Sequence, residues 1–305
     1  NGGNMFSKGD LIMRKVLLAT TALVGMGVTA AHADITISGY QNFEVSDNAS
    51  ATSWYIDGDV QIVSKNTTDA GLTLTAAHHI NTSAGDLTIS GDGETLTIND
   101  HVDDSYLDIA GEFGSIRMGN TDDALDRMDG AYPANWDENG SAASDAAAGS
   151  FAIGGTQPAV TASFISPTIS GATFYASSTA EGDYTGMGVN YSNGPVTVIY
   201  QSGTSGTTDS TLIAANVSFS GVTIGFGAGD KDAAGTKTEY ASMGIKYAVS
   251  DAIDLYALSQ KQKGNSQATS IGGYFQVAPG LQLAAEQHSD ENDDQTTYAH
   301  LKVSF

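Results

Sequence analysis

Polar and apolar residues alternate along most of this chain, and this alternation constrains its fold more than any other feature. In ITISGYQNFEV, Ile37 and Phe43 share one face, while Tyr40 and Asn42 share the other. A period of two puts neighbouring side chains on opposite faces of a β-strand. Such segments occur near residues 34–46, 52–65, 71–82, 102–111, 114–119, 157–166, 170–179, 183–192, 194–203, 208–219, 221–230, 237–249, 251–262, 266–277, 280–289 and 294–305. The sequence therefore predicts sixteen strands, each with one wet and one apolar face.

Sixteen strands of this kind favour a closed barrel. An apolar sheet face can contact lipid only if the sheet has no open edge, and sixteen strands enclose a water-filled interior. The connections also alternate between tight turns, such as 192–195, and longer acidic segments, such as 81–101. This pattern is typical of transmembrane barrels. We therefore predict an all-β fold, a sixteen-stranded antiparallel transmembrane β-barrel over residues 34–305. A secreted β-sandwich or surface adhesin stays open as the alternative, with its apolar faces buried in a core.

The start of the chain predicts export. Met13-Arg14-Lys15 precedes the apolar run VLLATTALVGMGV, and AHA at 31–33 has the spacing of a cleavage site. We interpret residues 13–33 as a secretory signal peptide and residues 1–12 as upstream read-through. A membrane-anchor helix is the alternative, but the apolar run is short for a bilayer span.

Composition excludes several classes of function. The chain has 35 acidic and 12 basic residues, so it repels nucleic-acid phosphates, and we expect no nucleic-acid partner. It has no Cys, which excludes thiolate catalysis and Cys-ligated zinc. A Ser-His-Asp hydrolase on a barrel is the enzyme alternative, but no G-x-S-x-G motif occurs. We therefore predict no enzyme, no catalytic residues and no organic cofactor.

The end of the chain points to a family. YAHLKVSF keeps the alternation to the terminal Phe305. With the signal peptide, the FGSIRMGN strand and the long segment after it, this ending resembles the Gram-negative outer-membrane general porins, most closely the sixteen-stranded alphaproteobacterial type. The resemblance implies passive diffusion of small hydrophilic solutes and ions, and a homotrimer surrounded by outer-membrane lipid and lipopolysaccharide. It also implies that Phe305 is part of the signal read by the outer-membrane assembly machinery. A substrate-selective channel, for example for sugars, stays open.

The segment 120–150 is the longest without alternation, and it is acidic. Its charged residues are Asp122, Asp123, Asp126, Arg127, Asp129, Asp137, Glu138 and Asp145. In the porins that the chain resembles, the loop after strand five folds inward and narrows the pore. The resemblance therefore implies that this loop, together with Arg117 on strand five, forms the constriction. An acidic loop on the outer surface is the alternative. Acidic loops of this kind are also able to bind structural Ca²⁺, but the sequence places no such site.

Alternation also predicts which side chains line the lumen. Tyr40, Asn42, Asp57, Asp59 and His79 fall on the polar face of the first three strands, and we find no Arg or Lys among the inward positions there. General porins usually place a basic cluster opposite the acidic loop, so the chain departs from the family here. An uncompensated negative lumen concentrates cations. We therefore predict a cation-selective channel. Small outward residues such as Gly39, Gly58 and Ala76 suggest a face for subunit packing.

Overall fold

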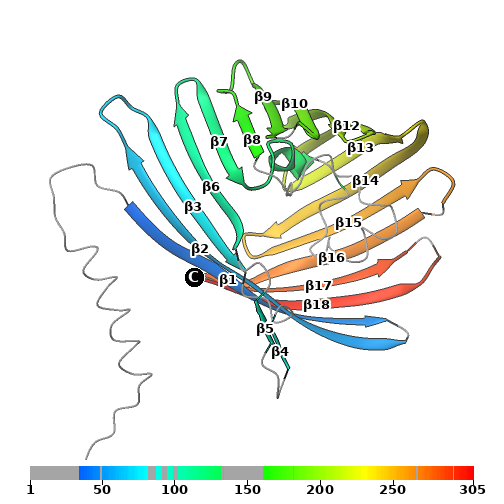
Figure 1. Ribbon diagram of the computed structural model, residues 1–305. Coiled ribbons are helices and arrows are strands. Elements are labelled where there is room, and N and C mark those ends of the chain that lie inside the picture. The colour runs from blue at the N-terminus through cyan, green and yellow to red at the C-terminus, as the bar shows by residue number, and fades with distance from the viewer. Residues whose placement is uncertain are drawn as a thin grey trace, which may run out of the picture. The chain divides into compact units, whose positions relative to one another are not determined.

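The computed structural model describes residues 34–48, 50–81, 87–90, 95–98, 102–131, 133, 161–180, 182–265, 267–290 and 292–305. The predicted signal peptide and the residues before it lie outside this part. Sixteen antiparallel strands form one closed barrel (Figure 1). The barrel strands are β1 (Asp34–Asn48), β2 (Ala51–Thr67), β3 (Thr73–Asn81), β6 (Val102–Gly111), β7 (Gly114–Asn120), β8 (Thr161–Ile165), β9 (Ala172–Thr179), β10 (Tyr184–Asn193), β11 (Val196–Ser205), β12 (Thr208–Phe219), β13 (Val222–Ala233), β14 (Thr236–Ser250), β15 (Ile253–Gln262), β16 (Gln267–Ala278), β17 (Leu281–Ser289) and β18 (Gln295–Ser304).

The predicted sixteen-stranded barrel is confirmed, including its closure. The last strand β18 pairs antiparallel with β1, so that Leu301 lies opposite Phe43. Beyond the end of β18, the N–H of Phe305 donates to the carbonyl of Gly39, and the N–H of Gly39 donates to the carbonyl of Phe305, both at 3.0 Å. The last residue of the chain is therefore part of the seam that closes the barrel. Closure leaves the barrel sheet without an edge, which is the condition for a sheet in hydrocarbon.

The two faces of the barrel wall differ as the alternation predicts. Large apolar side chains point outward and stay exposed, among them Trp54, Ile37 and Met187. Many inward positions hold polar side chains, among them Gln201 and His288, which are buried inside the ring. In the part of the chain that the structure describes, no helix is long and apolar enough to cross a membrane.

The connections differ from the prediction in two ways. Those between β11 and β12 and between β13 and β14 are two-residue turns, although the strand limits predicted from the sequence leave longer connections there. Positive φ angles at Ala234 and Gly235 give the β13–β14 turn the twist that suits a tight hairpin. The segment 81–101, predicted as a loop, contains a second sheet formed by β4 (Leu87–Ser90) and β5 (Thr95–Ile98). The alternation within the two tetrapeptides LTIS and TLTI accounts for their pairing as strands.

Candidate functional site

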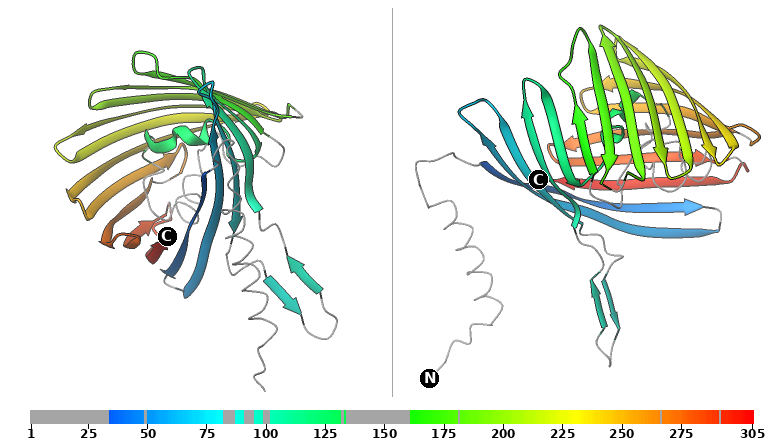
Figure 2. Two further views of the ribbon diagram at one scale, coloured as in Figure 1. Left: turned by 90° about the vertical axis from the view of Figure 1, so that its left-hand side faces the viewer. Right: turned by 45° about the horizontal axis from the view of Figure 1, so that its top comes forward.

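The chain folds into the barrel directly after β7, the fifth barrel strand. The 3₁₀-helix η1 (Asp126–Ala131) lies inside the ring of strands (Figure 2). Leu125 and Met128 are buried against inward side chains of β11 and β12, namely Ile199, Leu212 and Ala214. The predicted inward-folded loop is therefore confirmed for its described first part. Because β11 lies halfway round the ring from β1, this part of the loop covers the wall opposite the closing seam.

Hydrogen bonds from two wall strands hold the backbone of this segment. The N–H of Ala124 donates to Oγ of Ser177 on β9 at 2.6 Å. On β11, Nε2 of Gln201 donates to the carbonyl of Leu125 at 2.8 Å. Both bonds are buried, and a buried backbone group without a partner costs roughly 1–3 kcal/mol. The wall therefore offers polar partners as well as apolar contacts to the incoming loop.

Asp123 is buried and supports the backbone of the loop rather than lining the lumen. Its side chain is fully buried, and Oδ1 accepts hydrogen bonds from the N–H groups of Leu125 at 2.7 Å and Asp126 at 3.1 Å. This is the geometry of an N-cap at the start of η1. Burial raises the pKa of Asp123, and hydrogen bonds with Tyr184, Asp126 and Leu125 offset this only in part. The sequence had placed Asp123 among the constriction residues, but the structure places its carboxylate against the wall.

Replacing Asp123 tests this capping role. We expect Asp123→Ala to lower the free energy of unfolding by about 1 kcal/mol, because the cap is lost. Asp123→Asn keeps an acceptor oxygen and removes a buried charge, so it should be at least as stable as the parent. Since the folded pKa is raised, the contribution of the parent carboxyl to stability is fully present below its ordinary pKa of 3.8 and is lost as the pH rises through the folded value. The stability advantage of Asp123→Asn over the parent should therefore be larger at pH 7 than below pH 3.8. Stability is measured as the temperature at which heated samples change their gel mobility.

The other predicted loop residues divide into two groups. Asp122, Asp126 and Arg127 are partly exposed inside the ring. The backbone of Asp129 belongs to η1, but its side chain lies outside the described residues. Asp137, Glu138 and Asp145 also lie outside the described part. The structure therefore brings Asp122, Asp126 and Arg127 to the inner side of the barrel and does not test the remainder of the predicted set.

Arg117 and Arg127 lie on the same side of the lumen. The guanidinium of Arg117 sits 3.8 Å from the ring centre of Tyr106, and its Nε is 3.4 Å from Oδ2 of Asp108. Nη2 of Arg127 donates to Oγ of Ser163 on β8 at 2.9 Å. Burial lowers the pKa of Arg127, and the positive charge of Arg117 lowers it further. The charge of Arg117 is compensated by Asp108, whereas Arg127 reaches a neutral hydroxyl.

An acidic band lies on the inner wall of β2 and β6, beside inward side chains of β1 and β3. The hydroxyl of Tyr40 donates to Asp57 at 2.9 Å. Nδ1 of His79 lies 3.7 Å from Asp59 and 3.5 Å from Asp104. We call Asp57, Asp59 and Asp104 the acidic band. The sequence predicted the first two, but it missed Asp104 because inward positions were followed only over the first three strands.

The alternation assigns two further side chains of β1 and β2, those of Asn42 and Lys65, to the inner wall. Asn42 lies in register between Asp57 on β2 and Lys302 on β18, so its inward position agrees with the alternation. Lys65 has the same parity as Asp57 and Asp59, and its exposed side chain lies near the end of β2. The statement that the inward positions of the first three strands hold no Lys was therefore wrong for Lys65. Its place near the strand end keeps it several residues from the acidic band.

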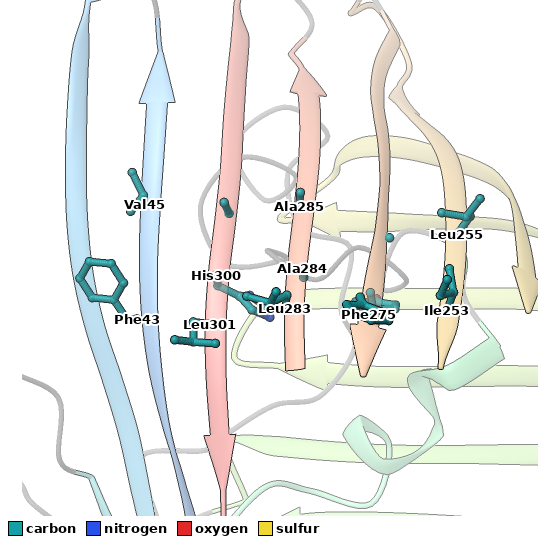
Figure 3. Close-up of a pocket in the computed structure, with 13 residues that line it drawn as sticks. Phe43, Val45, Ile253, Leu255, Phe275, Leu283, Ala284, Ala285, His300 and Leu301 are labelled. Atoms are coloured by element: carbon teal, nitrogen blue, oxygen red, sulfur yellow. The ribbon is translucent and has the colours of Figure 1, made fainter. Parts of the chain in front are cut away.

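Two other features of the described residues bear on the site, namely their possible metal ligands and a hollow in the barrel wall. Within the described residues, no three acidic or histidine side chains come together as metal ligands, so bound Ca²⁺ stays a prediction. A hollow of about 660 Å³ does occur, but its lining includes the outward residues Phe43, Leu283 and Leu301 (Figure 3). These residues stand on the lipid-facing side of β1, β17 and β18. The hollow is therefore a feature of the outer surface and not of the channel.

Comparisons with known proteins agree with this geometry. Residues 19–295 match the family described as Gram-negative porin. The search of curated proteins gave no match. A structure described as "Asymmetric conductivity of engineered proteins" superposes with a TM-score of 0.71 at 18% identity, covering 89% of this chain and 100% of that one. A mutant of the Rh. blastica porin gives a TM-score of 0.70 at 17% identity, with the same coverage. A triple mutant of the Rhodopseudomonas blastica porin gives 0.70 at 18%, again with the same coverage. At these identities the superpositions show a shared fold.

Proposed function

Because the chain belongs to the Gram-negative porin family and forms a diffusion channel in the outer membrane, we propose that this channel passes small hydrophilic solutes and ions and prefers cations. The observation that carries the preference is the acidic band, whose three carboxylates line the wall over β2 and β6. Asp122 and Asp126 add negative charge from the loop. Fixed carboxylates raise the local concentration of cations over a Debye length of about 8 Å at physiological salt.

The basic side chains in this region offset the negative charge only in part. Arg117 is compensated by Asp108 at 3.4 Å. Lys302 lies 4.5 Å from the ring centre of Tyr40, next to the acidic band, and Arg127 lies in the loop. The carboxylates still outnumber the bases around the described lumen, which supports a net negative permeation path.

Solute size and chemistry test the first half of the proposal. In liposome swelling, we expect uptake rates that fall smoothly with the size of neutral solutes, without preference for a sugar series. A sugar-selective channel would instead favour oligosaccharides of matching length over smaller solutes. The ring centres of Tyr256 and Tyr274 lie 5.4 Å apart, but Tyr256 is buried and donates a hydrogen bond to Glu286. Tyr256 is therefore bound to another side chain of the barrel wall. This favours a general diffusion channel over a sugar-selective one.

The outer face of the first strands supports a homotrimer. Nδ1 of His78 and Oγ of Ser105 lie 2.9 Å apart at outward positions of β3 and β6. A polar pair facing hydrocarbon is costly, but it is tolerated where another subunit covers it. Ala76 shares this outward face and is partly exposed, so a neighbouring backbone has room to approach there. Gly58 also points outward but is already buried within the chain. Gly39 does not belong to this set, because a Cβ there would lie 3.1 Å from the ring of Phe305.

Replacing a small residue on this face tests the assembly. We expect the parent protein to show the mass of a trimer in mild detergent. Ala76→Arg should shift the mass toward the monomer, because a charged side chain would enter the interface. Ile213→Arg provides a control, since Ile213 is outward and exposed on β12, far round the ring. A parent protein that shows only monomers would contradict the proposal.

A further inference from the structure

We infer that Gly186 and Gly188 on β10 are positioning residues that set the bore of the channel by seating the inward-folded loop. Both glycines face the lumen, because Met187 between them points outward and is 65% exposed. In register they lie opposite Ser177 on β9 and Gln201 on β11. Neither glycine adopts a positive φ, so backbone conformation does not require glycine here. Glycine inside a strand weakens it and often marks a close approach of another segment.

The close approach is made by the loop. A Cβ added at Gly186 would lie 2.5 Å from the hydroxyl oxygen of Tyr184, on the same strand, and 2.7 Å from Cδ1 of Leu125 in the loop. A Cβ added at Gly188 would lie 2.6 Å from Sδ of Met128 and 2.9 Å from Cδ2 of Leu125. The missing side chains therefore leave a recess in the inner wall, and the two apolar side chains of the loop fill it. Protein interiors are packed so closely that even one added carbon must displace a neighbour.

Hydrogen bonds on both sides of the recess fix the depth of the loop. Ser177 and Gln201, on the strands flanking β10, bind the backbone at Ala124 and Leu125. The loop lies flat against β10 because neither glycine carries a side chain, although the hydroxyl of Tyr184 on the same strand also reaches the space beside Gly186. A side chain at either glycine would push Leu125 and Met128 toward the pore axis, because the wall closes the other direction. This inference uses the channel fold and does not depend on the proposed cation preference.

Single-channel conductance in planar bilayers tests this positioning. We expect Gly188→Leu to lose the parental conductance level and to show a smaller one. The double variant Gly188→Leu with Met128→Ala should recover toward the parental level, because removing the Met side chain restores space. Thr185→Leu is the matched control, since it adds a similar side chain to the outward face of the same strand. An unchanged conductance in Gly188→Leu, or a reduced one that Met128→Ala does not restore, overturns the inference.

A crosslink provides a second test, in a variant where the shorter side chain at position 128 leaves room for the one added at position 188. The chain has no Cys, so Met128→Cys and Gly188→Cys together introduce a single pair of thiols. We expect a short thiol-reactive crosslinker to join them within one subunit, and the joined channel to keep the conductance of the same variant before crosslinking. Failure to crosslink the folded barrel overturns the inference. Neither readout depends on the sign of ion selectivity. A failure of the proposed cation preference is therefore distinguishable from a failure of this inference.

Discussion

Replacing Phe305 with Asp is expected to reduce strongly the amount of folded barrel in the outer membrane, while the channels that do fold keep their conductance. The backbone of Phe305 closes the seam through its two hydrogen bonds with Gly39, and its ring lies over that glycine. The side chain itself is 68% exposed, so burial within the barrel explains little of its role. A charge at this lipid-facing rim is unfavourable. If the terminal aromatic is the assembly signal that the resemblance implies, this signal is lost as well. Heat-modifiable gel mobility of membrane extracts measures the folded fraction.

A second aromatic at the same rim provides the control. Phe219 ends β12, points outward and is 57% exposed, and it precedes a tight turn on the same side of the barrel as the chain end. Phe219→Asp places the same charge in a similar environment without touching the seam. We expect it to assemble far better than Phe305→Asp. Normal assembly of Phe305→Asp, or an equal loss in both variants, would refute the assigned role of the terminal residue.

Neutralising partly exposed carboxylates of the wall and the loop should remove most of the cation preference. In the variant that combines Asp57→Asn, Asp59→Asn, Asp122→Asn and Asp126→Asn, the shape of the lumen is retained while four negative charges are lost. The preference depends on fixed charge near the permeation path, so it should fall toward that of an uncharged pore. Asp123→Asn is the internal control, because its carboxyl is buried at the cap of η1. Equal effects of Asp123→Asn and the fourfold variant would show that lumen position is not what matters.

The strands could be predicted because their evidence is local. Alternation with period two is a property of each segment by itself, and all sixteen predicted barrel strands are present. Strand ends and turns were less predictable, since LTIS and TLTI in the segment 81–101 are short and were counted as loop. The φ values at Ala234 and Gly235 similarly allow a tight hairpin where only a longer loop was expected.

The site was less predictable because its parts are distant in sequence. The resemblance to porins implied that Asp123 belongs to the constriction. An Asp just before a helical turn also fits a capping position, and this local pattern was the available clue. The recess at Gly186 and Gly188 has no comparable clue. A glycine in a strand gives no indication of which distant segment approaches it, and here the partner is Leu125, some sixty residues earlier. Such a pairing emerges only when the barrel is closed and the loop is in place.

The most direct measurement of the proposed function is the reversal potential of the unaltered channel in a KCl gradient across a planar bilayer. The proposal predicts a sign that shows K⁺ to be more permeant than Cl⁻, with a preference that decreases as the mean salt concentration rises, because screening shortens the reach of the acidic band. A reversal potential that indicates preference for Cl⁻ would contradict it.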